Sequence, residues 1–498
     1  MIFINCLEDE MNVSFTENGM KGYATTKDVL VDFNFSLPAI RNMSDELLHT
    51  QVVQLLNDKK HNKEVIYRYM FFLRDVRGGL GERRIFREML KELANKEPEL
   101  VKHFIKYIVE VGRWDDLFVL METPLKKCLI ETLCKQLEVD WDNMQKDKSI
   151  SLLAKWMPSI NSGKKSRKLA REFIGYYGMT NGEYRKALSE MRKYLDIVEQ
   201  HISNNTYNEI DYEAVPSKAN KKYAELFMRK DMQRRQKYLD SLSKGKAKIN
   251  ASTLYPHEII SMVRRNSDKR LTQGLWENLK DYEGVENTLV VADVSGSMTW
   301  GGNNIMPIDC SVGLALYFAQ RAKDEFKGKV VTFSDKPTYV DVSRFKTVYD
   351  AYIWMIERMD WNGSTNIEAV FKLVLDTAVR NKLKQEDIPN ILIISDMEFN
   401  ECTYGNGLES ISELYRSYGY KLPKLIFWNV ASRSGTIPVI ENENGLVLVS
   451  GYSPAAIKAA TSNETYDPLK AIYDCIYVER YNFVREVLEA NCENSCAG

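Results

Sequence analysis

The chain has 498 residues, which is more than one hydrophobic core usually holds, so we expect two or three domains. Charged residues make up 28% and hydrophobic residues 44%, and the formal net charge is -1. These are ordinary globular values, and they point to no particular partner. The acidic opening residues argue against a secretory leader, and the lack of a long apolar run argues against a membrane span, so we expect neither. We therefore expect a cytoplasmic protein of cellular, viral or phage origin.

The cysteines exclude two further classes. They are scattered along the chain, at Cys6, Cys128, Cys134, Cys310, Cys402, Cys475, Cys492 and Cys496. No pair has CxxC spacing, and no histidine lies near a cysteine at ligand spacing. The pattern argues against a zinc site and against a disulfide framework, and it favours a reducing compartment.

Charge is distributed unevenly between the two halves. Residues 1–280 contain 48 Lys and Arg against 39 Asp and Glu, whereas residues 281–498 contain 20 against 30. The basic excess is concentrated in residues 148–280. This asymmetry suggests an anionic partner for the first half, although a solvated helical surface would also explain it.

Residues 1–40 form a mixed N-terminal segment, and residues 41–285 have a helical pattern almost throughout. In "MSDELLHTQVVQLLND", Ser44 is the expected N-cap of the first helix. Apolar residues recur at helical spacing in 62–76, 83–95, 99–112 and 124–139, with short breaks between them. Consecutive amphipathic helices of this length predict an all-α, HEAT-like solenoid or ring.

Several breaks in this helical region are basic. "RDVRGGLGERR" (74–84) surrounds three glycines with arginines, and "SGKKSRKLARE" (162–172) enters a helix. From local charge we select a set of candidate RNA-binding residues: Arg74, Arg77, Arg83, Arg84, Lys164, Lys165, Arg167 and Lys168. The glycines Gly78, Gly79 and Gly81 are also explained by interhelical turns alone.

Residues 214–260 are basic and contain Tyr223, Phe227, Tyr238 and Tyr255. Basic and aromatic residues on the same helices suit RNA, because cations contact phosphates and rings stack on bases. The alternative is that the rings form the buried stripe of each helix and the cations its wet face.

After residue 285 the hydrophobic period changes. Short apolar, β-branched runs at 287–295, 328–335, 389–399, 423–431 and 445–451 alternate with helical patterns. Strands that are apolar on both faces predict a mainly parallel sheet covered by helices. We therefore predict that residues 286–498 form a doubly wound α/β domain with a C-terminal helical extension.

Oxygen-bearing side chains gather at the expected strand ends of this domain. "DVSGS" (293–297) follows the first strand, "GST" places Thr365 before a helix, and Asp396 ends the strand in "IISD". Carboxyl ends of parallel strands bind ligands at the switch point of the sheet. The expected metal ligands are Asp293, Ser295, Ser297, Thr365 and Asp396, and this all-oxygen set suits Mg²⁺ or Mn²⁺. Neutral hydroxyls would leave the ion open to an acidic oxygen of a partner.

Enzymatic alternatives fit less well. A phosphatase of the DxD type lacks its second aspartate, because Ser295 stands in that place. No histidine follows His257 and GxSxG is missing, which argues against a Ser-His-Asp hydrolase. A metal-dependent nuclease is disfavoured because no general base accompanies the hydroxyls, although Asp396 could serve. We therefore expect that this protein is not an enzyme.

The metal motif resembles the metal-ion-dependent adhesion site (MIDAS) of von Willebrand factor A domains. The helical stretches "RDVRGGLGERRIF", "GRWDDLF", "LLAKWMPS" and "INASTLYPHEII" resemble a family related to the TROVE module of the Ro ribonucleoprotein autoantigen. The resemblance covers roughly residues 40–485. It implies a HEAT-like ring closed by a von Willebrand A domain, and a protein that binds structured or single-stranded-ended RNA.

Two hypotheses of different class stay open. One is a non-enzymatic RNA-binding protein that also carries a metal site for an acidic ligand. The other is a metal-dependent protein-interaction adaptor that binds no RNA. We expect no membrane association under either, and neither the RNA nor the oligomeric state is determined by the sequence.

Overall fold

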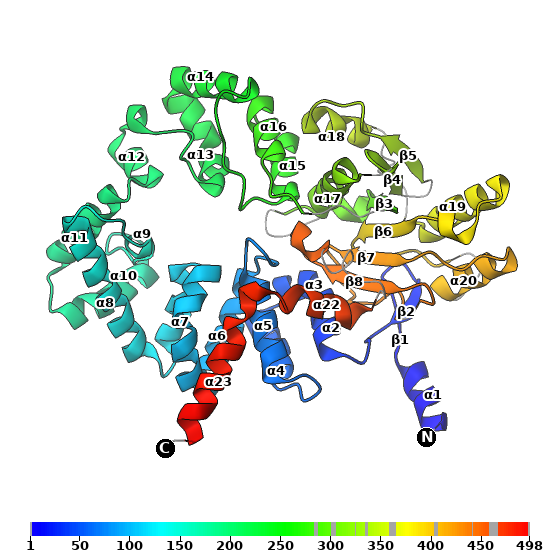
Figure 1. Ribbon diagram of the computed structural model, residues 1–498, viewed down its shortest axis with the longest axis horizontal. Coiled ribbons are helices and arrows are strands. Elements are labelled where there is room, and N and C mark those ends of the chain that lie inside the picture. Colours follow the sequence, from blue (N-terminus) through cyan, green and yellow to red (C-terminus); the bar gives the residue numbers. More distant parts are fainter. Residues whose placement is uncertain are drawn as a thin grey trace.

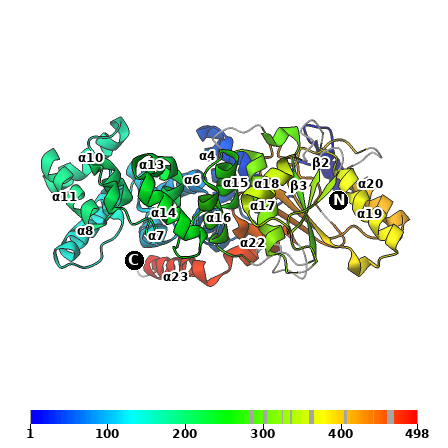
Figure 2. The ribbon, with the colours of Figure 1, turned by 90° about the horizontal axis from the view of Figure 1, so that it is seen from above.

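The computed structural model describes residues 2–282, 287–299, 305–323, 325–333, 337–357, 365–402, 407–440, 442–457 and 467–496. The helices of the first half follow one another around an arc, and a sheet with its own helices closes the arc (Figure 1). Seen from above, the arc and the sheet occupy opposite ends of an elongated molecule (Figure 2). The expected division into a helical first part and an α/β second part is confirmed at this level.

The N-terminal segment belongs spatially to the sheet end. It contains α1 (Ile2–Met11), β1 (Val13–Phe15), β2 (Lys21–Tyr23), α2 (Val29–Phe35) and α3 (Leu37–Asn42). β1 and β2 form an antiparallel hairpin, and Gly19 and Tyr23 make β-bridges to Asn400 and Ile437. The N-terminal hairpin is thus hydrogen-bonded to segments that follow β6 and β7.

The arc is built of amphipathic helices joined by short turns. Its elements are α4 (Asp45–Leu56), α5 (Lys63–Arg74), α6 (Arg83–Lys96), α7 (Pro98–Val111), η1 (Trp114–Glu122), α8 (Lys126–Gln145), α9 (Leu153–Trp156), α10 (Lys164–Tyr177), α11 (Asn181–Tyr194), α12 (Val198–Asn204), η2 (Tyr207–Glu209), α13 (Ser217–Lys230), α14 (Met232–Ser243), α15 (Pro256–Arg264) and α16 (Lys269–Glu277). Ser44 caps α4 as expected, because its hydroxyl accepts from the Leu47 amide. No helix of the described ranges is long and apolar enough to cross a membrane.

The three-glycine break between α5 and α6 is a tight interhelical turn. A Cβ on Gly79 would lie 1.9 Å from the carbonyl oxygen of Phe72. Gly81 has φ +72° and packs against the Tyr255 hydroxyl, so a side chain would be strained there and would also clash. The explanation of these glycines by turn geometry therefore suffices.

The second part is built on one sheet with the strand order β5-β4-β3-β6-β7-β8. The strands are β3 (Thr288–Asp293), β4 (Lys329–Phe333), β5 (Thr338–Asp341), β6 (Asn390–Ser395), β7 (Leu425–Asn429) and β8 (Leu446–Ser450). All neighbours pair in parallel except β4 and β5. The five predicted strands are present. The edge strand β5 was not predicted, because it has four residues and only one of them is buried.

Helices cover this sheet and join it to the arc. They are η3 (Gly296–Thr299), α17 (Pro307–Arg321), α18 (Val348–Glu357), α19 (Ile367–Asn381), η4 (Gln385–Asp387), α20 (Leu408–Ser417), η5 (Pro454–Ile457), α22 (Pro468–Ile476), η6 (Glu479–Tyr481) and α23 (Phe483–Cys496). α17 packs against β3, β4 and β6 on one side and against α15 of the arc on the other.

The C-terminal helices return to the start of the arc. α22 packs on β8 and α5, and α23 packs on α5 and α7 (Figure 1). Phe483 stacks on Tyr107 with a centroid distance of 4.2 Å, and Arg480 and Tyr481 bind the buried carboxylate of Asp75. These contacts close the arc without a covalent link. The predicted boundaries at residues 40 and 285 stay predictions.

Candidate functional site

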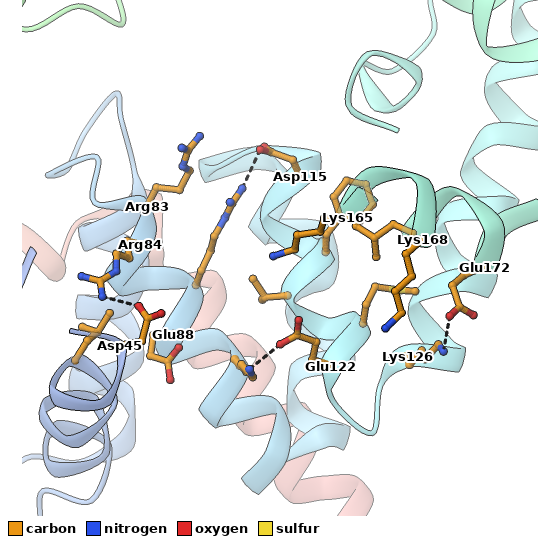
Figure 3. Close-up of a pocket in the computed structure, with 17 residues that line it drawn as sticks. Asp45, Arg83, Arg84, Glu88, Asp115, Glu122, Lys126, Lys165, Lys168 and Glu172 are labelled. Atoms are coloured by element: carbon orange, nitrogen blue, oxygen red, sulfur yellow. Dashed lines mark hydrogen bonds and ion pairs between the residues drawn. The ribbon is translucent and has the colours of Figure 1, made fainter. Parts of the chain in front are cut away.

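The helical arc contains a groove between α6 and α10, which we call the α6–α10 groove (Figure 3). Its volume is about 650 Å³. Its lining residues are Asp45, Leu48, Arg83, Arg84, Arg87, Glu88, Lys91, Asp115, Phe118, Val119, Met121, Glu122, Lys126, Lys165, Lys168, Leu169 and Glu172. Apolar side chains of η1 form the floor, and long charged side chains form the two walls.

Buried ion pairs fix the floor. The Asp116 carboxylate is fully buried, and it accepts from Arg74 Nε and Arg87 Nε at 2.7 Å each. It also accepts from the Arg113 amide at 2.9 Å, which caps the start of η1. Side chains from α5 and α6 therefore hold η1 in place. Without these three donors, the buried charge of Asp116 would be strongly unfavourable.

Four cations of the groove are paired with carboxylates. The pairs are Arg84–Asp45 at 2.6 Å, Arg87–Asp115 at 2.9 Å, Lys91–Glu122 at 2.8 Å and Lys126–Glu172 at 3.0 Å (Figure 3). A ligand that used these four cations would have to compete with a carboxylate already in place. Exposed pairs such as Lys91–Glu122 contribute little to stability, so a ligand can replace their carboxylate at small cost. Arg87 is the exception, because it also binds the buried Asp116.

Three other cations of the groove, Arg83, Lys165 and Lys168, have no ion pair among the described residues. Burial, followed by the charges of Arg113 and Arg87, lowers the pKa of Arg83. Arginine stays protonated regardless, so its side chain is a partly desolvated cation close to others of the same sign. Across the groove, Lys91 foremost and then Lys165 and Lys168 lower the pKa of Glu122. The unpaired cations give the groove a positive field that its own carboxylates do not cancel.

The structure separates the eight predicted RNA-binding residues. Arg83, Arg84, Lys165 and Lys168 line the groove. Lys164 and Arg167 are exposed on the same helix outside the lining, and Arg77 is exposed in the glycine turn. The choice of Arg74 was wrong, because its side chain is buried against Asp116 and cannot reach a ligand.

Arg87, Lys91 and Lys126 line the groove but were not predicted. A signal existed for two of them. Arg83, Arg87 and Lys91 are spaced i, i+4, i+8, which places them on one face of α6. The role of Lys126 depends on the packing of α8 and carries no local signal.

The aromatic residues of 214–260 are mostly structural. Phe227 and Tyr238 are buried, whereas Tyr223 and Tyr255 are partly accessible. Phe227 and Tyr238 pack around the buried guanidinium of Arg235. Of the two explanations left open for these rings, the burial of Phe227 and Tyr238 favours the buried stripe over stacking on bases. They form the inner stripe of their helices.

A second candidate site lies where β3 and β6 end. Asp293 is the last residue of β3, Asp396 directly follows β6, and the two strands are parallel neighbours. The Ser295 amide donates to Asp293 Oδ1 at 2.9 Å, and the hydroxyls of Ser295 and Ser297 are 3.0 Å apart. β4 and β6 flank β3 on opposite sides, so this is the switch point of the sheet.

The two carboxylates of this site affect each other. Burial, and then the nearby charge of Asp396, raises the pKa of Asp293. Burial also raises the pKa of Asp396, against a hydrogen bond from Ser297 and the charge of Arg433. The Ser395 hydroxyl donates to Asp293 Oδ2. Ser395 was missed in the sequence although it directly precedes Asp396, because a buried strand serine gives no ligand signal.

The donor set fits a hard cation in its chemistry. Asp293, Ser295 and Asp396 are at most 2% exposed and offer only oxygen atoms. Thr365 is buried, and its carbonyl oxygen accepts from the amide of Asn400, in the segment that follows β6, at 2.9 Å. Within the described ranges, no three His, Cys, Asp or Glu side chains gather at metal-binding spacing. Any ion here would therefore depend on the hydroxyls as well as on the two carboxylates.

Comparisons with known proteins find two domain families and one relative, and none of their descriptions names an activity. Residues 174–290 match a domain of unknown function (DUF2828), and residues 287–479 match another (DUF7788). The chain is 29% identical over 514 residues to uncharacterised protein L728 of Acanthamoeba polyphaga mimivirus, covering 93% of this chain and 86% of that protein. Among solved structures, the RO (RSR) protein of Deinococcus radiodurans aligns with a TM-score of 0.37 at 12% identity, covering 95% of this chain and 96% of that one.

Proposed function

We propose that this protein is a non-enzymatic RNA-binding protein that holds RNA in the α6–α10 groove. The observation that carries the proposal is the set of unpaired cations, Arg83, Lys165 and Lys168, around one concave surface. Phosphate oxygens are the ligands that such a set attracts, because each contact releases a counterion. A phosphate can also contact one of the four ion-paired cations, but only after it displaces the carboxylate paired with that cation.

A single-stranded segment fits this groove better than a duplex. The floor is apolar, with Phe118, Val119 and Met121 partly exposed between the cationic walls. Bases of an unpaired strand can lie against apolar side chains while its phosphates face the walls. The resemblance to TROVE-related sequences and their HEAT-like rings agrees with this choice of ligand.

The site at the ends of β3 and β6 is proposed as a separate adhesion-type metal site. Asp293, Ser295, Ser297 and Asp396, together with the predicted ligand Thr365, would hold Mg²⁺ or Mn²⁺. The sheet order and the position of these residues at its switch point support a von Willebrand A-like domain. A bound ion would supply an electrophilic centre for a carboxylate of a protein partner. Arg433, whose Nη2 is 3.8 Å from Asp396 Oδ2, adds a positive charge beside that centre.

The test is an RNA filter-binding titration of the full chain at several salt concentrations. Arg83→Glu/Lys165→Glu/Lys168→Glu should weaken binding of an RNA with a single-stranded end by at least about tenfold. It should also reduce the slope of log affinity against log salt by about 0.7 for each lost phosphate contact. The matched control Lys244→Glu/Lys246→Glu/Lys248→Glu changes the charge equally at exposed positions away from the groove.

Equal losses in the two triple variants would show that binding follows net charge and not the groove. No RNA binding by the wild-type chain at low salt would leave the metal-dependent adaptor as the better function.

A further inference from the structure

Helix α1 has an apolar stripe that nothing in the described chain covers. Ile4, Leu7 and Met11 are 53%, 43% and 78% exposed, respectively. Their i, i+3, i+7 spacing places them on one face of the helix. α1 projects from the sheet end of the molecule (Figure 1). An exposed apolar stripe on a projecting helix is costly in water unless a partner buries it.

Acidic residues flank this stripe on both sides. At 100° per residue, Glu8 and Glu10 lie about 70° and 90° to either side of the centre of the stripe. Neither forms an ion pair with a described residue, whereas Asp9, on the opposite face, pairs with Lys27 at 2.7 Å. α1 thus presents an apolar centre between two unpaired carboxylates.

The α6–α10 groove has the complementary pattern. Its floor is apolar, and its unpaired cations stand on opposite walls, Arg83 on α6 and Lys165 and Lys168 on α10 (Figure 3). A helix seated on the floor with its stripe downward would direct one carboxylate toward each wall. The three unpaired cations would then gain charge-assisted partners.

The helix cannot reach the groove of its own chain. The Lys27–Asp9 ion pair and the two hydrogen bonds between Asn12 and Thr25 tie the end of α1 to the hairpin region. That region and α10 lie at opposite ends of the molecule in both views (Figures 1 and 2). The occupant is therefore α1 of another molecule.

We propose that α1 of one copy docks in the α6–α10 groove of a second copy. Ile4, Leu7 and Met11 lie on the floor, and Glu8 and Glu10 face the two walls. The interface is head-to-tail, so it joins different surfaces of the two copies and leaves one groove free at the end of each chain of molecules. Because it fills the groove, self-association competes with RNA, and this last point rests on the function proposed above.

The experiment is sedimentation velocity of the full-length chain over a wide range of concentrations, with a charge-exchange design. Wild type should self-associate increasingly with concentration. Glu8→Lys/Glu10→Lys and Lys165→Glu/Lys168→Glu should each stay monomeric, because helix and groove then carry the same sign. Mixing these two variants should restore association, since each supplies the complement of the other. All four substituted residues are exposed, and thermal melts of both variants check that they fold as wild type does.

A monomeric wild type at the highest concentration, or folded variants that fail to associate on mixing, would overturn the proposal. RNA binding separates it from the function above. Glu8→Lys/Glu10→Lys keeps an intact groove and should bind RNA at least as tightly as wild type. Restored association without RNA binding by any form would uphold the docking and reject the RNA ligand.

Discussion

The two candidate sites differ in how the fold builds them. The α6–α10 groove uses long, flexible cations from helices spread over residues 45–172, and most of them are accessible to water. The site at the ends of β3 and β6 uses short side chains of Asp293, Ser295 and Asp396, which are at most 2% exposed and are fixed by hydrogen bonds. The first site is suited to bind by summed charge, and the second by the position of a few atoms. Substitutions should therefore act gradually in the groove and abruptly in the buried site.

The groove itself contains the same contrast, between the buried Asp116 beneath its floor and the exposed cations of its walls. Substituting Asp116 should give the largest change in the free energy of unfolding of all the variants considered. Asp116→Ala removes the carboxylate that pairs with Arg74 and Arg87 and caps η1. It leaves the Arg74 guanidinium buried without its partner, so we expect a loss of about 3–5 kcal/mol in the free energy of unfolding. Lys165→Ala, on the exposed wall, should change it by less than about 0.5 kcal/mol. Urea unfolding measures both, and equal small effects would contradict the assigned role of Asp116.

The buried site could be predicted from the sequence, because its chemistry depends on local motifs and on topology. Alternation of strands and helices predicts a parallel sheet, and a parallel sheet brings carboxyl strand ends together. Asp293 and Asp396 were found in this way although 103 positions separate them. Ser395 was missed because its hydrogen bond to Asp293 depends on which neighbouring strand lies beside β3.

The groove was only partly predictable. Local charge identified Arg83, Arg84, Lys165 and Lys168, but it also selected Arg74. Whether an arginine near a glycine turn faces solvent or a buried aspartate depends on long-range packing. The partner, Asp116, is 42 residues away, and no local pattern connects the two. The edge strand β5 shows the same limit, since a strand of four residues with only one of them buried carries too little hydrophobic pattern.

Metal addition should act on the buried site alone. If the proposed ion binds, Mg²⁺ at about one hundred times its dissociation constant should add about 2.7 kcal/mol to the free energy of unfolding. Asp293→Asn should abolish this increment and leave the metal-free fold intact, because it removes one of two neighbouring buried carboxylates. RNA affinity should not change. Urea unfolding with and without Mg²⁺ measures the effect, with Glu386→Gln as a surface control of equal charge change. An unchanged midpoint on Mg²⁺ addition to wild type would reject the metal site.

Acid should weaken the joint between the arc and the sheet. His257 on α15 packs against Tyr452 after β8 and against Gly313 of α17, and burial lowers its pKa to about 3. Glu258, Lys218, Lys221 and Arg41 are the charged groups around it. Between pH 6.5 and 3 the unfolded chain takes up a proton on this histidine and the folded chain does not. The free energy of unfolding should therefore fall as the pH falls, by about 2 kcal/mol from pH 6.5 to 5.

The variant His257→Gln isolates this contribution, since every other titrating group is shared with wild type. Its unfolding free energy should fall less between pH 6.5 and 5 than that of wild type, by the same amount. Glu258, whose pKa is lowered to about 2, loses its contribution only below its unfolded value of 4.5, outside this window. Parallel pH profiles for the two proteins would show that His257 is not held neutral.

The smallest expected effect separates affinity from stability in the groove. The Glu122 carboxylate is 61% exposed, pairs with Lys91 at 2.8 Å and lies in the field of Lys165 and Lys168. Glu122→Gln removes a negative charge that phosphates would otherwise have to displace, so RNA affinity at low salt should rise about two- to fivefold. The unfolding free energy should change by less than about 0.5 kcal/mol, because exposed pairs contribute little. Glu99→Gln is the matched control, since Glu99 is also exposed and pairs with Lys102 on α7, outside the groove. If both variants raise the RNA affinity equally, the gain comes from the overall charge of the protein. That result would contradict the proposal that RNA binds in the groove.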